Sequence, residues 1–215
     1  MNLPSENNWN SFWNSNKQSQ FTKISWSKKR IEEVLLKYIK KNCTVLDAGC
    51  GSGYFSNMFL KYNCQVYSLD YSKEAIDIAK KLTSGQAKYI IGDLLDEKFC
   101  DKYKGKFDLI FSDGLFEHFT EKDQIKILKN FIKMKSKRGV ITTFVPNKFS
   151  FWEVIRPIFM PQIKEDPFTL KDLENLSKKV GIKVIESGGL NVLPLKLSPE
   201  KLGKYLGMIL FSISK

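Results

Sequence analysis

Histidine and cysteine are scarce in this sequence of 215 residues, and their scarcity excludes several kinds of chemistry. The single histidine, His118, limits hydrolytic schemes of the Ser-His-Asp or Cys-His type, and no such arrangement is evident. No group of His, Asp and Glu has the spacing of metal ligands along the chain, so we expect no metal. Four cysteines are too few and too scattered for a disulfide framework, and none forms a CxxC pair of the kind that binds zinc. They are Cys43, Cys50, Cys64 and Cys100.

Arginine is also rare, although the net charge is +12, from 35 Lys and Arg against 23 Asp and Glu. Only Arg30, Arg138 and Arg156 are arginines, and the other basic residues are lysines. Nucleic-acid recognition favours clustered arginine, whose planar guanidinium pairs bidentately with phosphates and base edges. The diffuse lysine charge is therefore a weak sign of nucleic-acid binding, but it still attracts anionic partners.

Long apolar runs are absent, and none approaches the roughly 18 residues that a membrane-spanning helix needs. The first 20 residues are rich in Asn and Ser and lack the charged and apolar regions of a secretory signal. A cytoplasmic location is the expectation. The composition, 42% hydrophobic and 27% charged, is that of an ordinary globular protein.

Short apolar runs alternate with helical patterns over the middle of the chain. This alternation is typical of βαβ units and a parallel sheet, and runs that are apolar on both faces predict helices on both sides of it. The five predicted strands are residues 44–47, 65–69, 88–91, 107–111 and 140–145.

The rhythm changes towards the C-terminus. Residues 183–186 predict a sixth strand, and Gly188-Gly189 predicts a turn into a seventh at 190–197, which should pair antiparallel with the sixth. We therefore expect an α/β fold with a seven-stranded, mostly parallel sheet, an antiparallel last strand and helices on both faces. We divide the chain into an N-terminal helical and aromatic cap segment (1–40), a main domain (41–197) with a lid insertion (146–168), and a C-terminal apolar helix (198–215).

A glycine-rich loop carries the strongest functional signal. Val45-Leu46-Asp47-Ala48-Gly49-Cys50-Gly51-Ser52-Gly53 joins the first predicted strand to a helix, and glycines there let the backbone approach a ligand closely. Asp70 ends the second strand 19 residues after Gly51, where a carboxylate can accept hydrogen bonds from both hydroxyls of a ribose. An adenosyl ligand is therefore predicted.

Two details argue against a nicotinamide dinucleotide. Position 54 is Tyr, whereas the dinucleotide fingerprint G-x-G-x-x-G needs a glycine there. Asp47 would repel a pyrophosphate, but it suits a ligand that carries a positive amine. S-adenosyl-L-methionine has an amine and a sulfonium and no phosphate, so the electrostatics favour this methyl donor.

With these motifs, residues 30–197 resemble the class I S-adenosylmethionine-dependent methyltransferases, which have a three-layer Rossmann-like sandwich. The resemblance implies that residues 41–197 bind the donor. By it, Asp47 and the glycine loop hold the methionine end, Asp70 the ribose, and Asp93 lies near the adenine amino group. The cofactor-binding residues that it implies are Asp47, Gly49, Gly51, Gly53, Asp70, Tyr71, Asp93, Leu94 and Ser112. Asp113, the next residue, is interpreted as a solvated turn residue.

The segment Gly114-Leu115-Phe116-Glu117-His118-Phe119 is similar to one in the small-molecule branch of this family, which includes quinone-biosynthesis methyltransferases. Methyl transfer is an in-line displacement, so the enzyme must mainly hold the nucleophile and the methyl group in line. His118 is the candidate catalytic base. The alternative is that His118 and Glu117 only orient the loop or contact the donor.

Aromatic residues of the cap and lid predict an apolar or aromatic acceptor, although plain packing over the sheet is an equal alternative for each. Trp9, Phe12 and Trp13 recur on one helical face. The candidate acceptor-binding residues are Trp13, Phe21, Trp26, Phe151 and Trp152.

The leading hypothesis is methyl transfer to a small molecule, and the alternatives are a methyltransferase acting on RNA or protein and a non-catalytic adenosyl-binding protein. The apolar tail, with its lysines, suits peripheral membrane contact, a partner, or packing on its own core.

Overall fold

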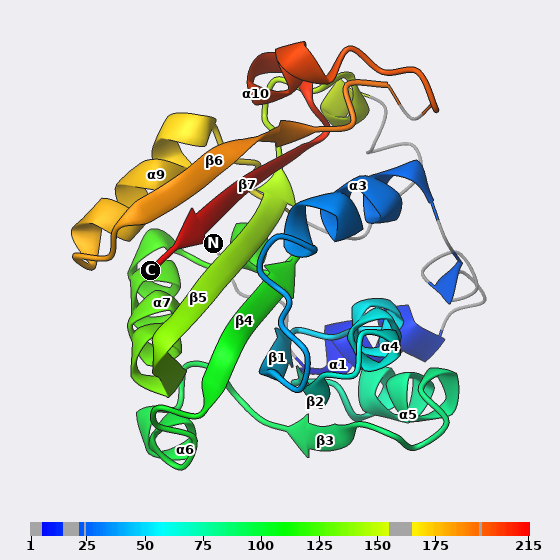
Figure 1. Cartoon of the computed structure of the whole chain (residues 1–215), viewed down its shortest axis with the longest axis vertical. Coiled ribbons are helices and arrows are strands. Elements are labelled where there is room, and N and C mark those ends of the chain that lie inside the picture. The colour runs from blue at the N-terminus through cyan, green and yellow to red at the C-terminus, as the bar shows by residue number, and fades with distance from the viewer. Residues whose placement is uncertain (1–5, 15–21, 24, 155–164, 194) are drawn as a thin grey trace.

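The computed structural model describes residues 6–14, 22–23, 25–154, 165–193 and 195–215. Within these ranges one seven-stranded sheet runs through the molecule, in the order β3-β2-β1-β4-β5-β7-β6 (Figure 1). Its strands are β1 (Thr44–Ala48), β2 (Gln65–Asp70), β3 (Lys88–Ile91), β4 (Phe107–Asp113), β5 (Lys135–Pro146), β6 (Val184–Leu190) and β7 (Ile209–Ser214). The helices that follow below are α1 (Glu6–Asn14), α3 (Trp26–Leu35), α4 (Tyr54–Lys61), α5 (Lys73–Leu82), α6 (Glu97–Asp101), α7 (Glu121–Met134), α9 (Leu170–Lys179) and α10 (Gly203–Leu206).

Strand direction confirms the predicted fold class. The pairs β1–β2, β1–β4, β2–β3 and β4–β5 are parallel, and β7 is antiparallel to both β5 and β6. The parallel strands end at one edge of the sheet, and β1 and β4 are adjacent although β2 and β3 lie between them in sequence. In such open sheets the carboxyl edge at this switch of strand order is where ligands bind.

The two faces of the sheet carry separate apolar clusters because side chains alternate along each strand. On β4, Leu109 belongs to the cluster that α3 and α4 cover, and Ile110 to the cluster that α7 and α9 cover. Both side chains are fully buried, as expected for parallel strands between two helix layers. The sheet is therefore the middle one of three layers, with helices on each side.

The C-terminal prediction is wrong. Residues 198–215 do not form an apolar helix: they contain a 3₁₀ turn, the one-turn helix α10, and then β7, which lies between β5 and β6. Five of the six β7 residues are buried, so its sequence is apolar on both faces, and periodicity alone does not distinguish such a strand from a buried helix.

The predicted turn at Gly188-Gly189 is also wrong, because both glycines lie inside β6. A Cβ on Gly188 would lie 3.0 Å from the Phe211 ring of β7, and one on Gly189 would lie 2.0 Å from the carbonyl oxygen of Gly203. These glycines therefore serve close packing of neighbouring backbone and rings rather than a change of chain direction.

A strand was predicted at 190–197, but Leu190 is the last residue of β6, and the described residues after it in this range form no strand. The buried Arg30 of α3 donates hydrogen bonds to the backbone of this segment, to the carbonyl oxygens of Leu193 (3.0 Å) and Leu195 (2.5 Å). Its carbonyls are thus satisfied by a guanidinium instead of a strand ladder.

Helix α1 lies over the carboxyl edge of the sheet, against the start of α5 and the glycine loop. Its Asn10 side-chain oxygen accepts a 2.6 Å hydrogen bond from Ser72 Oγ, at the start of α5. Its Trp13 packs on the glycine loop, so that a Cβ on Gly51 would lie 2.7 Å from the indole ring. Part of the predicted lid, 155–164, lies outside the described residues.

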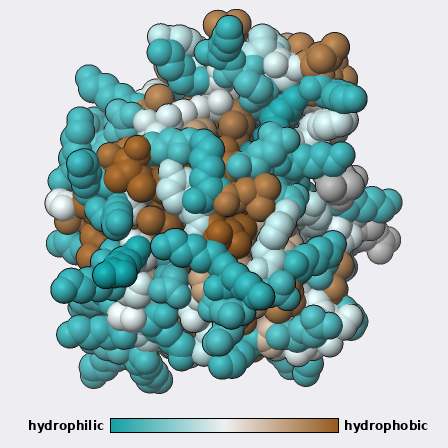
Figure 2. All heavy atoms as spheres, in the orientation of Figure 1, coloured by the Kyte–Doolittle hydropathy of each residue, from teal (hydrophilic) through white to brown (hydrophobic). Residues whose placement is uncertain are grey.

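The molecular surface is largely hydrophilic on the face seen in Figure 2, with small, separate apolar areas. Several exposed apolar side chains come from the tail, where Leu197 is 86% exposed and Tyr205 is 59% exposed. Of the helices in the described ranges, none has the length and apolar character that crossing a membrane takes.

Candidate active site

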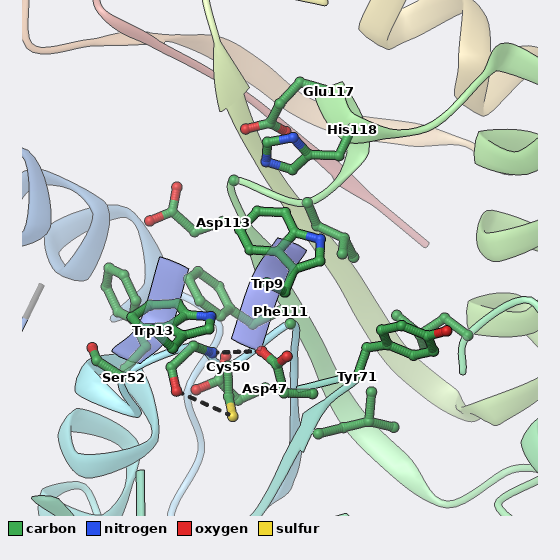
Figure 3. A pocket seen from close by; sticks show the side chains of 18 of the residues that line it. Trp9, Trp13, Asp47, Cys50, Ser52, Tyr71, Phe111, Asp113, Glu117 and His118 are labelled. Carbon is green, nitrogen blue, oxygen red and sulfur yellow. Dashed lines mark hydrogen bonds between the residues drawn. The ribbon is translucent and has the colours of Figure 1, made fainter. Parts of the chain in front are cut away.

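A cavity of about 500 Å³ opens at the carboxyl edge of β1, β2 and β4, beneath α1. Its volume lies within the range of small-molecule and cofactor sites. Figure 3 shows Asp47, Cys50 and Ser52 towards one end, Glu117 and His118 at the opposite end, and Trp9 and Trp13 between them.

The glycine loop forms the floor at the first end. Gly49, Gly51 and Gly53 all have positive φ angles, of 73°, 48° and 76°, which residues with a side chain rarely adopt. The amides of Gly49 and Cys50 donate to the carbonyl oxygen of Leu69, at 2.8 and 2.9 Å. The loop is thereby tied to the end of β2.

Asp70 is held rigidly at the end of β2. Its Oδ2 accepts a 2.9 Å hydrogen bond from the Gly51 amide, and its Oδ1 accepts one of 2.9 Å from the Ser72 amide. Burial raises the pKa of Asp70, and the backbone amides oppose that rise. A carboxylate that two backbone amides orient is well placed to accept further hydrogen bonds from a bound ligand.

Asp47 is a buried acid, only 2% exposed, that lines the cavity beside the loop. Ser56 Oγ donates a 2.6 Å hydrogen bond to its Oδ2 and lies 2.7 Å from Ser68 Oγ. Burial raises the pKa of Asp47 to about 7, and the charges of Asp70 and Asp113 add to that rise. A cationic group in this part of the cavity would stabilise the ionised carboxylate.

The residues expected beside an adenine also line the cavity. Asp93 is exposed, and its Oδ1 accepts a 2.8 Å hydrogen bond from the Leu95 amide. Leu94 is buried, while Tyr71 is 44% exposed. The three therefore offer an acid, an apolar wall and an aromatic face to one end of the cavity.

Two of the predicted cofactor residues do not line the cavity. Gly53 faces α5 instead, where a Cβ would lie 2.7 Å from Ala79. Ser112 is fully buried, because strand alternation turns its neighbours Phe111 and Asp113 towards the cavity and Ser112 away from it. Gly53 thus shapes the loop.

Asp113 was expected to be a solvated turn residue, and that expectation is wrong. It lines the cavity, and burial raises its pKa to about 7 while the positive charge of Lys28 opposes the rise. Burial also lowers the pKa of Lys28 to about 8. The Lys28 ammonium lies 4.1 Å from the centre of the Tyr54 ring. The sequence could have placed Asp113 here, since strand alternation puts it on the same face as Phe111.

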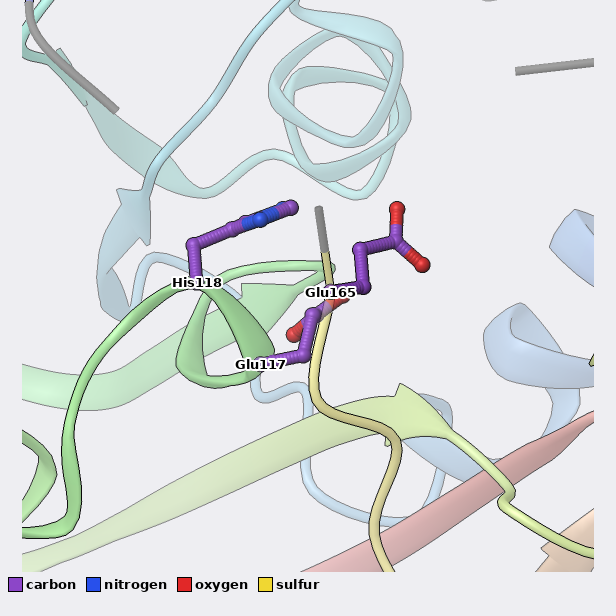
Figure 4. Close-up of side chains that lie close together, drawn as sticks. All are labelled: Glu117, His118 and Glu165. Carbon is purple, nitrogen blue, oxygen red and sulfur yellow. The ribbon is translucent and has the colours of Figure 1, made fainter. Parts of the chain in front are cut away.

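At the far end, Trp9 contacts His118 edge to face, with ring centres 4.9 Å apart. Glu117 and Glu165 lie beside His118, and one possible ligand atom from each of the three lies within 4.8 Å of the others (Figure 4). The expectation of no metal rested on spacing along the chain, whereas Glu165 is brought in from 47 residues further along (165 − 118). Linear spacing does not reveal such a cluster.

The predicted acceptor residues divide sharply. Trp13 lines the cavity, together with Trp9 and Phe12. Trp26 does not line it and lies under the Lys29 ammonium, 4.5 Å from the ring centre. Phe151, which is 73% exposed, and Trp152 do not line the cavity either. Phe21 lies outside the described residues. Of the predicted aromatic segments, only α1 therefore contributes to the described lining of the cavity, beside other aromatic residues such as Phe55 and Phe111.

A family model described as a methyltransferase domain matches residues 39–194. The chain belongs to this family. Its fold and its glycine loop are those expected of a class I S-adenosylmethionine-dependent methyltransferase, so S-adenosyl-L-methionine is the cofactor of the family. The residues present fit this cofactor, because the loop glycines Gly49 and Gly51 and the acids Asp47 and Asp70 line one end of the cavity.

Curated relatives match parts of the chain. A malonyl-[acyl-carrier protein] O-methyltransferase from Hamiltonella defensa is 37% identical over 102 residues, which is 47% of this chain and 37% of the relative. A ubiquinone biosynthesis O-methyltransferase from Coxiella burnetii is 34% identical over 105 residues, 46% of this chain and 44% of the relative. The match thus spans less than half the length of either relative. An uncharacterized protein from Methanocaldococcus jannaschii is 30% identical over 182 residues, 83% of this chain and 70% of that protein.

Solved structures share the whole fold. A SAM-dependent methyltransferase from Anabaena variabilis has a TM-score of 0.72 at 18% identity, and the match covers 100% of this chain and 97% of that chain. A structure of the Haloferax volcanii Trm112 methyltransferase activator in complex with a methyltransferase has a TM-score of 0.73 at 14% identity, with 96% of each chain covered. At these identities the likeness concerns the fold alone.

Proposed function

We propose that this protein transfers the methyl group of S-adenosylmethionine to a hydroxyl oxygen of a small apolar or aromatic molecule. The observation that carries the proposal is the division of one cavity into two ends. The glycine loop, Asp47 and Asp70 line one end, and Trp9 and His118 line the other. The two relatives named O-methyltransferases support oxygen as the acceptor atom.

The first end would hold the donor. Asp70 would accept hydrogen bonds from the ribose hydroxyls, and Asp47 would pair with the amine of the methionine moiety. Leu94 would pack on the adenine ring, with Asp93 near its amino group. The donor supplies a sulfonium methyl group: the acceptor oxygen bonds to that carbon as the carbon–sulfur bond breaks and its electron pair stays on sulfur.

The second end would hold the acceptor and accept its proton. Trp9 and Phe12 give this end an apolar wall that excludes water from the displacement. His118, held edge to face by Trp9, would take the hydroxyl proton as the oxygen–carbon bond forms. The other role open to His118 is to orient the loop without exchanging a proton.

A macromolecular acceptor is the second candidate, and the net charge of +12 favours it. Helix α1 lies over the cavity, however, and its aromatic wall suits a small apolar molecule better than a charged polymer. The two candidates differ in which molecules of a cell extract would receive the methyl group, small molecules or macromolecules.

The experiment uses donor labelled in its methyl group, the purified protein and an extract from which small molecules, RNA and protein are afterwards separated. The proposal predicts label in the solvent-extractable small-molecule fraction, and no label there with Asp70→Ala. Label confined to RNA or protein would replace the proposal by the second candidate. Binding of the donor without label in any fraction would indicate a non-catalytic adenosyl-binding protein.

A further inference from the structure

Three side chains that can ligate a metal ion converge at the acceptor end of the cavity. Glu117 and His118 are neighbours in the 3₁₀ turn after β4, and Glu165 enters from the segment before α9. One ligand atom from each lies within 4.8 Å of the others, and all three residues line the cavity (Figure 4). A single ion of ordinary bond length, about 2.0–2.3 Å, can reach three such atoms after small side-chain rotations.

Glu117 gives an independent sign that a ligand belongs here. It is 2% exposed, and within the described part of the chain its Oε2 atom is buried and has no hydrogen-bond partner. A buried carboxylate oxygen without a partner is costly, and native proteins rarely leave one so.

The surroundings of Glu117 are acidic as well. Burial raises the pKa of Glu117 well above its usual range, and the charges of Glu165, Asp113 and Glu153 raise it further. A cation placed among these acids would reverse that effect, because it favours their ionised forms.

We propose that Glu117, His118 and Glu165 bind one divalent transition-metal ion in the acceptor half of the cavity. One imidazole and two carboxylates suit Zn²⁺, Mn²⁺ or Fe²⁺ better than Ca²⁺ or Mg²⁺, which prefer all-oxygen sites. Three protein ligands leave coordination positions open, as in catalytic rather than structural metal sites.

The role of the ion rests on the proposed methyl transfer, whereas the site itself does not. An acceptor hydroxyl that coordinates the ion has a lower pKa, so it loses its proton to water near neutral pH. The oxygen then forms its bond to the methyl carbon as the carbon–sulfur bond breaks. With the ion bound, His118 would be a metal ligand, and this role would replace that of proton acceptor given to it above, because the same nitrogen lone pair cannot do both.

The direct test measures Mn²⁺ binding to the full chain, since free Mn²⁺ has an electron paramagnetic resonance signal that bound Mn²⁺ loses. We expect one ion per chain, with the dissociation constant raised roughly 10- to 100-fold or more in His118→Ala and in Glu165→Gln. Glu33→Gln, which removes an exposed carboxylate from α3 far along the chain from the cluster, is the matched control and should bind as the wild type does. Zn²⁺ should displace the bound Mn²⁺.

The same samples are titrated with S-adenosylhomocysteine, the demethylated product of the donor, and melted to verify that each variant folds. Absence of stoichiometric Mn²⁺ and Zn²⁺ binding, or equal affinity in Glu33→Gln, His118→Ala and Glu165→Gln, would overturn the metal site. If the chain binds S-adenosylhomocysteine but no metal ion, the metal site is overturned and the proposed function stands. If the chain binds the metal ion but not S-adenosylhomocysteine, the proposed function is overturned and the metal site stands.

Discussion

Two acids at the ends of neighbouring strands, the buried Asp47 and the partly buried Asp70, determine what the cavity can bind. Asp70 is oriented by two backbone amides, and Asp47 by one serine hydroxyl. Neither has a cationic partner among the contacts of the described residues, and burial raises the pKa of both. The arrangement is therefore complementary to a ligand with hydroxyls at one point and an ammonium at another.

The pH dependence of ligand binding follows from Asp47. Its pKa is about 7 in the free protein, so about half of the molecules carry a neutral Asp47 near pH 7. Only the ionised carboxylate can pair with the ammonium group of the ligand. We expect the dissociation constant for S-adenosylhomocysteine to rise as the pH falls below 7, by up to about tenfold per unit. Asp47→Asn should bind more weakly and lose this dependence. Calorimetric titrations between pH 5.5 and 8.5 measure it.

Asp113→Asn provides the control, since Asp113 lines the same cavity and also has a pKa raised to about 7. This variant should keep the dependence, with a midpoint at lower pH because one negative charge near Asp47 is gone. A wild-type constant that does not change over this range would contradict the role given to Asp47.

Stability of the ligand-free protein should show the opposite trend with pH. The folded-state pKa of Asp47 lies above its ordinary value of 3.8, so the folded chain binds the proton more tightly than the unfolded chain does. The contribution of Asp47 to the unfolding free energy is thus greatest below about pH 4 and is lost as the pH rises towards 7. Asp47→Asn should reduce that loss in urea titrations at pH 5 and pH 7.5. A loss of equal size in the variant would contradict this.

At the scale of elements, the glycine loop and α1 form opposite walls of the site. The loop was predictable because its glycines, the acid before it and the acid 19 residues later stand in the sequence at fixed spacing. The acceptor end of the cavity was predicted less well. Its acidic cluster depends on Glu165, which only the fold brings to Glu117, and Trp26 and Phe151 share an aromatic character with Trp13 but not its position.

Gly53→Ala tests whether loop and helix α5 must pack closely. The position has a φ of +76°, and a Cβ would lie 2.7 Å from the Ala79 backbone. Gly85→Ala shares the strained φ, +73°, but meets nothing within 4 Å. Both should lose about 1–2 kcal/mol to backbone strain, and Gly53→Ala about 1–3 kcal/mol more to overpacking. Equal losses of stability in urea titrations would show that the close contact is unimportant.

Trp13→Ala tests whether α1 covers the donor end of the cavity. Trp13 is buried against Gly51, so its removal should open the loop to water and raise the dissociation constant for S-adenosylhomocysteine roughly tenfold, about 1.4 kcal/mol. Trp26→Ala removes the same side chain from α3, outside the cavity, and should leave the constant unchanged. If both variants bind like the wild type, α1 is not part of the site.

For the whole molecule, the sequence predicted the class of fold but not how the chain completes its sheet. Alternating strands and helices up to residue 145 leave little choice of architecture. The predicted sixth strand ended too early because β6 contains two glycines, which favoured a turn. The seventh was misplaced because β7 is apolar on both faces, a pattern that also suits a buried helix. Gly188 packs against Phe211 of β7, and this contact between residues distant in sequence favours a strand over a turn at Gly188.

Removal of residues 207–215 should therefore abolish cooperative folding, because it deletes β7 from between β5 and β6 and leaves both strands with unpaired backbone groups. Removal of Lys215 alone, beyond the end of β7, should cost little. Thermal unfolding followed by circular dichroism distinguishes the two. A truncated chain that melts as the full chain does would mean that β7 is dispensable.

The most direct test of the central claim, that this cavity is an S-adenosylmethionine site, is thermal unfolding with S-adenosylhomocysteine beside NAD and buffer. Ligand at about 100 times its dissociation constant adds about 2.7 kcal/mol to the unfolding free energy, a readily visible rise in melting temperature. We predict that rise for the wild type and for Asp77→Ala, an exposed acid of α5, and its loss in Asp70→Ala. No rise with the adenosyl ligand, or a rise with NAD alone, would contradict the account.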